Sequence, residues 1–146
     1  MIELKRYPAV AADGSSASVT VASGPVIVKD GRVLLDKHGD DVFWKFPGGR
    51  VRDTESLQAT ALREVAEELG LTDVVLSGDP VVFTFHRFRD DVPEFVTLYH
   101  YRASTNMEPK AQRDVREVAW HPIDALPNDC APNIKPVMEA FKRMGL

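Results

Sequence analysis

The chain has 146 residues, of which 44% are hydrophobic and 27% charged, and its net charge is −4. This length fits one domain, so we expect a single domain over residues 1–146. The acidic balance gives no broad positive field, which excludes duplex nucleic acid as an expected partner. No apolar run reaches the roughly 18–20 residues of a membrane span, and the first residues lack a signal-peptide pattern. The single cysteine, Cys130, rules out an internal disulfide, so a soluble cytoplasmic protein is expected.

The first third of the chain is patterned as strands and turns. Small residues over 9–18 predict a loop, and apolar residues over 19–28 and 33–35 predict two strands. Between these strands the pair Asp30-Gly31 is typical of a tight hairpin. The segment Pro47-Gly48-Gly49 ends a further strand, because proline and paired glycines interrupt regular structure. The chain is therefore expected to turn sharply after Gly49.

Residues 55–69 are expected to form the first helix. This stretch contains no glycine or proline, Asp53 and Thr54 before it are both N-cap types, and Gly70 suits the position after the last turn. Apolar residues recur at spacings of three and four, which gives the helix one buried stripe. That stripe comprises Leu57, Ala61, Leu62, Val65, Ala66 and Leu69.

The second half of the chain predicts further strands and a closing helix. Strands are expected over 74–76, 81–85, 96–101 and 115–120, with breaks at Gly78 to Pro80 and at Asp90 to Pro93. A helix is expected from Asn133 to Met144, with Ile134, Val137, Met138 and Phe141 facing inward. Strands with helices before and after them indicate a layered α/β or α+β domain.

Three carboxylates of the first helix share one face. Glu64, Glu67 and Glu68 lie at i, i+3 and i+4, within an arc of about 100°. Like charges at this spacing repel one another, so a neutralising partner is expected. Mg²⁺ accepts a few carboxylate oxygens and keeps waters and substrate phosphates in its other positions. The functional interpretation is a phosphate-cleaving metal site; the alternative is an ordinary solvated helix face.

The spacing around these acids favours the functional interpretation. Gly49 is followed after five residues by Glu55 and after seven more by Arg63-Glu64-Val65-Ala66-Glu67-Glu68-Leu69-Gly70-Leu71. This pattern resembles the Nudix box at every specified position, and it lies on the loop and helix predicted from caps and periodicity. The segment Trp44 to Gly49 is similar to the family's lead-in, and Glu117 to Trp120 with Leu126-Pro127 is similar to its last strand and exit.

The resemblance implies an α/β/α sandwich around a mixed sheet and the hydrolysis of a nucleoside diphosphate linked to another group, with Mg²⁺ or Mn²⁺. It implies that Glu64, Glu67 and Glu68 act as metal ligands and that Gly49 offers its backbone carbonyl. Glu55 lies about 180° round the helix from Glu64 and is expected to support the loop and the helix N-terminus. Arg63 is expected to orient the carboxylates.

A carboxylate must also take the proton of the attacking water. The helix acids are candidates, and the family often draws another acid from a later loop. Asp114, Glu117, Glu94 and Glu108 are available, and for each the alternative is an ordinary exposed acid. We rank Glu117 first, for its place in the family-like exit, and then Asp114.

Several residues are candidates for contacting the substrate. Lys37, Lys45 and Arg50 are the expected phosphate-binding cations, with His38, Arg52, Arg87 and Arg89 also near the expected site. The histidines are given no catalytic role. Aromatic residues could stack on a base, although core packing is the commoner role of each. They are Trp44, Phe83, Phe85, Phe88, Tyr99 and Tyr101.

The sequence lacks a feature of one substrate subclass of the family. The proline found about sixteen residues beyond the box in relatives that cleave ADP-ribose is replaced here by Arg87. The expected reaction is therefore hydrolysis of a nucleoside triphosphate to a monophosphate and pyrophosphate by a monomer or homodimer. ADP-ribose and dinucleoside polyphosphates remain alternative substrates. A non-catalytic ligand-sensing module is an alternative of another class, although such relatives tend to lose the box acids that this chain keeps.

Overall fold

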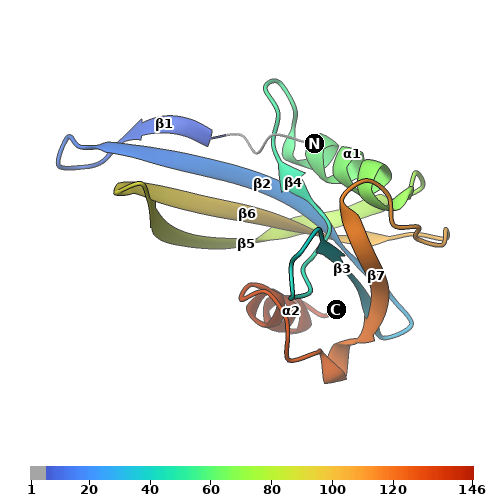
Figure 1. Cartoon of the computed structure of the whole chain (residues 1–146). Coiled ribbons are helices and arrows are strands. Elements are labelled where there is room, and N and C mark those ends of the chain that lie inside the picture. The colour runs from blue at the N-terminus through green and yellow to red at the C-terminus, as the bar shows by residue number, and fades with distance from the viewer. Residues whose placement is uncertain (1–5) are drawn as a thin grey trace.

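The computed structural model describes residues 6–146 and shows a mixed sheet with one helix on each side (Figure 1). The strand order is β5-β6-β2-β3-β7, and β1 and β4 also pair with β2. The strands are β1 (Arg6–Val10), β2 (Ser16–Lys29), β3 (Arg32–His38), β4 (Gly49–Arg50), β5 (Val75–Arg89), β6 (Val92–Ser104) and β7 (Val115–Pro122). The helices are α1 (Leu57–Leu69), the short 3₁₀ turn η1 (Ile123–Ala125) and α2 (Ile134–Arg143).

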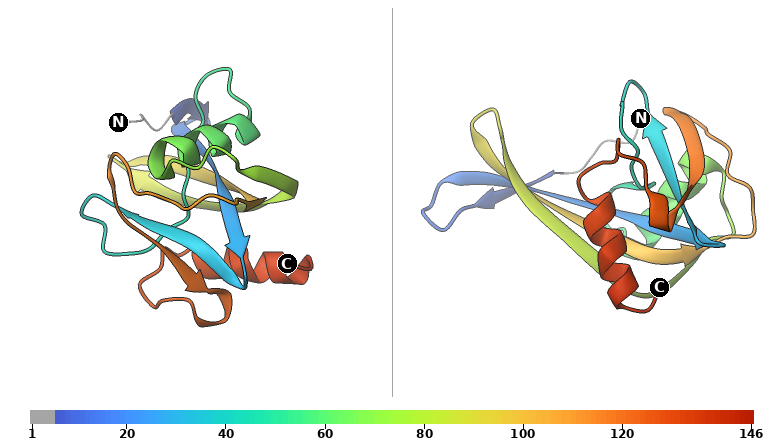
Figure 2. Two further views of the ribbon diagram at one scale, coloured as in Figure 1. Left: turned by 90° about the vertical axis from the view of Figure 1, so that its right-hand side faces the viewer. Right: turned by 90° about the horizontal axis from the view of Figure 1, so that it is seen from below.

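The two helices cover opposite faces of the sheet (Figure 2). β2 and β6 run parallel, whereas β2 pairs antiparallel with β3 and β5 with β6, so the sheet is mixed. This arrangement confirms the expected α/β/α sandwich. Among the described helices, none has the length and apolar content to cross a membrane.

Strand alternation divides the core into two layers. Successive side chains of a strand point to opposite faces, so the neighbours Leu34 and Leu35 are both fully buried but pack against different helices. Leu35 belongs to the cluster that packs on α2, and Leu34 to the cluster that includes Val65 and Leu69 of α1. The continuous apolar run over 33–35 is thus explained by a strand covered on both sides.

The hairpin prediction at Asp30-Gly31 is confirmed. β2 ends at Lys29 and β3 begins at Arg32, which leaves a two-residue turn. Asp30 and Gly31 have φ values of 52° and 73°. Positive φ at both central residues matches the twist of the flanking strands, which favours this pair of residue types.

The predicted start of the first helix is wrong by two residues. α1 begins at Leu57, and its N-cap is Ser56, whose hydroxyl accepts a hydrogen bond from the backbone N–H of Ala59. Thr54 cannot serve as the cap because it adopts a left-handed conformation with φ of 68°. The predicted end is correct, because Gly70 is left-handed and donates its N–H to the carbonyl of Ala66.

Three predicted breaks are shorter than expected. The loop over 9–18 is reduced to a tight turn, because β1 continues to Val10 and β2 begins at Ser16. Gly78 to Pro80 lie inside β5, where the register with β6 shifts between Ser77 and Val81 as a bulge absorbs them. The break from Asp90 to Pro93 is a hairpin turn at Asp90 and Asp91, and β6 already includes Pro93.

The predicted bounds and buried face of the last helix are confirmed. α2 spans Ile134–Arg143, within the expected range of residues 133–144. Its four expected inward side chains are all buried, namely Ile134, Val137, Met138 and Phe141. The period of three and four residues was therefore sufficient to fix which face of this helix meets the sheet.

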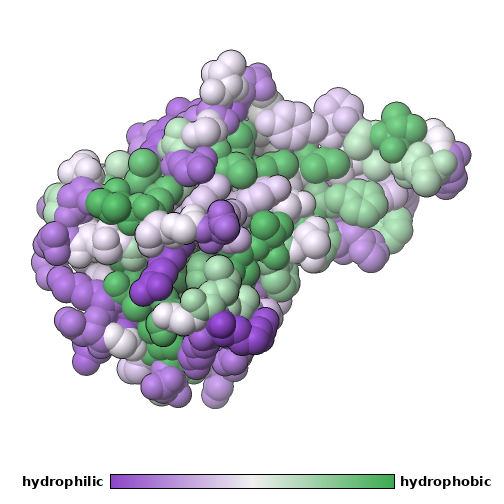
Figure 3. All heavy atoms as spheres, turned by 180° about the vertical axis from the view of Figure 1, so that it is seen from behind, coloured by the Kyte–Doolittle hydropathy of each residue, from purple (hydrophilic) through white to green (hydrophobic). Residues whose placement is uncertain are grey.

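One end of the sheet projects beyond both helices and carries the β1–β2 and β5–β6 turns (Figure 1). Apolar surface is visible along this projecting end (Figure 3), and Phe88 is 70% exposed. Inside it lies Glu94, whose carboxylate is fully buried. The carboxylate accepts hydrogen bonds from the Thr20 hydroxyl at 2.7 Å and from the Arg87 Nε at 3.1 Å, and it lies 3.5 Å from the Arg6 Nε. A polar cluster thus joins four strands of the projecting end.

Candidate active site

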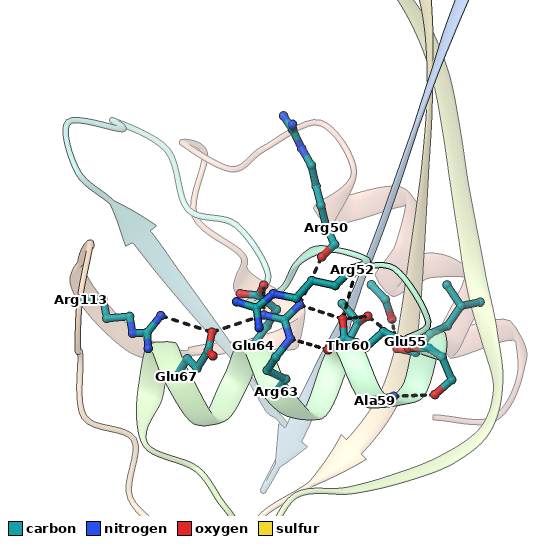
Figure 4. Close-up of polar contacts among 12 residues, drawn as sticks. Arg50, Arg52, Glu55, Ala59, Thr60, Arg63, Glu64, Glu67 and Arg113 are labelled. Atoms are coloured by element: carbon teal, nitrogen blue, oxygen red, sulfur yellow. Dashed lines mark hydrogen bonds and ion pairs between the residues drawn. The ribbon is translucent and has the colours of Figure 1, made fainter. Parts of the chain in front are cut away.

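The loop before α1 is tied to the helix through Arg63 and Glu55. The guanidinium group donates two hydrogen bonds to the Glu55 carboxylate, at 2.5 and 2.9 Å, and one to the Arg50 carbonyl at 3.3 Å (Figure 4). The Glu55 carboxylate also accepts bonds from the Thr60 hydroxyl and the Arg52 backbone N–H. Hydrogen bonding from Arg63 lowers the pKa of Glu55 to about 2. Loop and helix are therefore held together by charge-assisted bonds.

Arg63 also reaches the glutamates that follow it. Its Nη1 group donates to the Glu64 carboxylate at 2.8 Å and to the Glu67 carboxylate at 3.3 Å. One guanidinium group thus contacts Glu55, Glu64 and Glu67, three of the four glutamates of the motif (Figure 4). The structure places Arg63 where it can fix the orientation of these carboxylates.

Glu64 and Glu68 are the two glutamates that line a cavity. Both are buried, and the cavity of about 230 Å³ is also lined by Gly49, Lys45, His38 and other residues. Burial, followed by the neighbouring Glu68 carboxylate, raises the pKa of Glu64 to about 7. Burial and the like-charged neighbour thus both disfavour the ionised form of Glu64, and a nearby positive charge would oppose this effect.

Gly49 makes close contact with Glu64. A Cβ atom on Gly49 would lie 2.4 Å from the Glu64 Cδ, so no other residue fits here without displacing that carboxylate. The loop backbone and the carboxylate therefore line the same wall of the cavity. Gly49 thus lies beside Glu64, and the role of its carbonyl as a metal ligand stays a prediction.

Glu67 lies apart from this pair. Its carboxylate is within 3.3 Å of Arg63 and 3.4 Å of Arg113, and the residue is not among those lining the cavity (Figure 4). The helical wheel explains the difference, because Glu64 and Glu68 are about 40° apart whereas Glu67 lies about 60° to the other side of Glu64. The three acids share a broad arc, but the structure brings two of them into the cavity.

Two residues of β3, Asp36 and His38, lie next to Glu68, and of these two His38 lines the cavity. The His38 Nε2 lies 2.7 Å from the Glu68 Oε2 and 3.2 Å from the Asp36 Oδ1. Burial lowers the pKa of His38, but the two carboxylates more than offset this effect and raise the pKa to about 9. The sequence analysis counted His38 among the cations near the expected site, gave it no catalytic role, and did not consider Asp36. The available signal was an aspartate ending an apolar strand run, followed two residues later by a histidine on the same face.

The predicted phosphate-binding cations are scattered. Lys45 lines the cavity and lies 2.6 Å from the Asp41 carboxylate. Arg50 is buried, and its side chain points away from the glutamates (Figure 4). Lys37 lies near Asp129, at 3.4 Å, and over the Trp44 ring, on the face of β3 opposite to His38. Of the three, Lys45 alone lines the cavity.

The four candidates for the general base also lie in different parts of the molecule. Asp114 lines the cavity together with Arg113 and Val115. Glu117 is half-exposed, pairs in register with Lys37, and lies 3.8 Å from that ammonium group, so it shares the far face of the sheet. Glu94 is buried in the projecting end, and Glu108 lines a separate surface hollow with Lys29 and Arg32. The structure therefore brings Asp114, but not Glu117, to the glutamates.

A second cavity of about 210 Å³ adjoins the first. Both are lined by Lys45, Phe46, Gly48 and Gly49, so this loop segment separates them. The second cavity is also lined by Tyr99, His100 and Asn133 from β6 and from the start of α2. The Asn133 Nδ2 lies 3.3 Å from the His100 Nε2, and burial lowers the pKa of His100 to about 4. The imidazole is thus neutral at physiological pH, in a site with aromatic and amide groups.

The other aromatic candidates have different surroundings. Trp44 packs edge-on against His121, and the Phe83 and Phe85 rings are 6.0 Å apart on β5. Phe88 is exposed on the projecting end, and Tyr101 is buried. Among the predicted stacking residues, Tyr99 is the one that lines the second cavity.

Comparison with known proteins decides the family. The sequence model of the NUDIX domain family matches residues 18–141. The chain belongs to the Nudix hydrolase family. The cavity lined by Glu64, Glu68 and Gly49 therefore lies at the box that defines this family, and the Nudix resemblance noted from the sequence is confirmed. That one domain spans residues 1–146 stays a prediction.

Individual relatives agree with this assignment. The chain is 32% identical over 108 residues to the nucleoside triphosphatase NudI of Escherichia coli O139:H28, covering 66% of this chain and 77% of the relative. It is 27% identical over 126 residues to the m7GpppN-mRNA hydrolase dcap-2 of Caenorhabditis elegans, covering 77% of this chain but only 16% of that protein. The crystal structure of a MutT Nudix hydrolase from Burkholderia pseudomallei superposes with a TM-score of 0.64 at 25% identity, covering 83% of this chain and 96% of that one.

Proposed function

We propose that this Nudix domain hydrolyses a nucleoside triphosphate to a monophosphate and pyrophosphate with Mg²⁺ as cofactor and Mn²⁺ as a substitute. The observation that supports this most directly is the pair of buried carboxylates, Glu64 and Glu68, which line one cavity together with the Gly49 loop. The relative NudI, which is named a nucleoside triphosphatase, supports the choice of substrate class. A cytoplasmic location stays a prediction from composition.

The donor set suits a hard divalent cation. Within residues 6–146, neither oxygen of Glu68 accepts an aligned hydrogen bond although both are buried. The His38 Nε2 lies 2.7 Å from one of these oxygens and is shared with Asp36, so the buried acids here outnumber their cationic partner and a further cation would stabilise them. Glu64, Glu68 and the Gly49 carbonyl would hold Mg²⁺, which favours oxygen ligands. When bound, the ion would neutralise phosphate oxygens and acidify a coordinated water.

The chain's own residues would perform the remaining tasks. Lys45 and Arg113 line the cavity with positive charge and would hold the phosphate groups of the substrate. Asp114 would accept the proton as the water oxygen bonds to phosphorus and the bond to the leaving pyrophosphate breaks. Arg63 would keep Glu64 oriented throughout. The adjoining cavity, with Tyr99 and Asn133, would receive the nucleoside.

The test is product analysis across a nucleotide panel with Mg²⁺. We expect pyrophosphate and a monophosphate from at least one triphosphate, and loss of this activity in Glu68→Gln. Glu139→Gln, an exposed glutamate on α2, is the matched control and should keep full activity. Cleavage of ADP-ribose or dinucleoside polyphosphates alone would replace the substrate class. Tight nucleotide binding without any turnover would favour the ligand-sensing alternative.

A further inference from the structure

Asp36 and His38 of β3 bring a second set of metal-ligand groups to Glu68. They are two residues apart on one strand, so their side chains lie on the same face, the one that meets α1. The His38 Nε2 is 3.2 Å from the Asp36 Oδ1 and 2.7 Å from the Glu68 Oε2. One potential ligand atom from each residue lies within 4.8 Å of the others. The three groups thus converge on one point between the strand and the helix.

The two buried carboxylates of this cluster share a single polar partner, the His38 imidazole. The Asp36 side chain is completely buried, and within the described part of the chain neither of its oxygens accepts an aligned hydrogen bond. The same holds for both oxygens of Glu68. Buried charges are ordinarily paired, hydrogen-bonded or bound to a metal. The polar neighbour available to Asp36 is the imidazole nitrogen, which is itself a metal ligand when neutral.

We propose that Asp36, His38 and Glu68 form a second divalent cation site, which takes Zn²⁺ or a similar transition-metal ion in preference to Mg²⁺. Because Glu68 also belongs to the magnesium site proposed above, this inference rests in part on the proposed function. Imidazole suits Zn²⁺, whereas Mg²⁺ selects oxygen ligands and keeps several waters. A nitrogen donor from His38 therefore gives this site a different metal preference from that of Glu64 and Gly49.

The spacing of the ligand atoms fits such an ion. Zinc bonds to nitrogen and oxygen are about 2.0–2.2 Å, so ligand atoms of a tetrahedral site are roughly 3.3–3.6 Å apart. The distance of 3.2 Å between His38 and Asp36 is close to this value, and that of 2.7 Å between His38 and Glu68 needs a small opening. His38 and Glu68 line the cavity, which provides access for the ion. Three protein ligands leave a fourth position open toward the substrate.

The proposed Zn²⁺ site is tested by NMR of the His38 imidazole nitrogen. Untagged, ¹⁵N-labelled protein is saturated with Mg²⁺ and titrated with Zn²⁺ while long-range ¹H–¹⁵N spectra record the imidazole nitrogens. We expect one Nε2 resonance to shift with Zn²⁺, and this resonance to be missing in His38→Gln. By calorimetry, His38→Gln should weaken Zn²⁺ binding by at least about tenfold. His86→Gln, which removes an exposed histidine of β5, should bind Zn²⁺ like the wild type.

The outcomes separate this proposal from the proposed function. A His38 resonance that ignores Zn²⁺, or equal Zn²⁺ affinity in His38→Gln and wild type, overturns the second site, and magnesium-dependent hydrolysis would be unaffected by that result. Conversely, a His38 shift in a protein that hydrolyses no nucleotide supports the cation site and rejects the proposed function. The wild-type titration decides the matter even if a variant fails to fold.

Discussion

A side chain on Gly49 would begin where the carboxylate of Glu64 lies, because a Cβ atom there falls 2.4 Å from the Glu64 Cδ. Gly49→Ala should therefore force the carboxylate aside and lower the free energy of unfolding by about 1–3 kcal/mol, the usual cost of overpacking. Urea unfolding measures this change.

A double variant tests whether the contact with Glu64 causes the loss of stability in Gly49→Ala. Glu64→Ala removes the carboxylate, so adding Gly49→Ala to it should cost less than about 1 kcal/mol. If the glycine substitution is equally costly in both backgrounds, the contact with Glu64 is not the reason for glycine at this position.

Glu68→Gln should reduce turnover more than Glu67→Gln. Glu68 is buried in the cavity, whereas Glu67 lies between Arg63 and Arg113 outside it. We expect a loss of about 10²-fold or more in kcat for Glu68→Gln, the scale of a lost group that stabilises the transition state. For Glu67→Gln we expect a loss below about tenfold. Steady-state kinetics at saturating Mg²⁺ compare the two, and equal losses would contradict the division seen in the structure.

The base prediction is revised in favour of Asp114. Because Asp114 lines the cavity and Glu117 lies on the far face of β7, Asp114→Asn should lower kcat by about 10²–10⁴-fold. Glu117→Gln should stay within about twofold of wild type. Both variants are compared at saturating substrate and Mg²⁺. A collapse of activity in Glu117→Gln with a normal Asp114→Asn would show that the ranking from sequence was right.

The Glu55 contact predicts a specific acid dependence of stability. The pKa of Glu55 is about 2 in the folded protein against 4.5 ordinarily, so the folded state binds fewer protons between these values. The contribution is complete above about pH 4.5 and is lost as the pH falls toward 2. The difference between these two pKa values corresponds to about 3.4 kcal/mol, which solvent screening reduces to about 1–2 kcal/mol. Urea unfolding from pH 2.5 to 7 should show this loss, and a Glu55→Gln variant should lack that component.

Local chemistry predicted much of the fold. Gly70 fixed the end of α1, the Asp30-Gly31 pair fixed the first hairpin, and helical spacing identified the buried face of α2. The start of α1 was missed because Thr54 adopts a left-handed conformation and leaves the cap to Ser56. Signals confined to a few neighbouring residues were thus reliable, except where an unusual backbone conformation intervened.

Contacts between distant elements could not be predicted in the same way. The register of β3 with β7 shifts between Lys37 and His38, so His38 pairs with Val115 and Arg116 is bypassed. A shift of one residue decides which face a side chain occupies, and here it places Val115 rather than Arg116 opposite His38. Glu117 pairs with Lys37 just before the shift, on the far face. The approach of Asp36 and His38 to Glu68 likewise depends on how β3 meets α1, which no local pattern specifies.

The polar cluster around Glu94 gives the projecting end of the sheet a different source of stability from the body. The two apolar clusters lie beneath α1 and α2, whereas the projecting end is joined by Glu94 with Thr20, Arg87 and Arg6. Regions with few buried apolar contacts open locally at lower free energy than the global unfolding transition. Amide hydrogens near Phe88 should therefore exchange with solvent through such local openings, whereas those of α2 should exchange only through global unfolding. Acid that protonates Glu94 would weaken the polar cluster and lower the opening free energy of the projecting end further below that of the body. In acid the protein would therefore unfold in two stages rather than one.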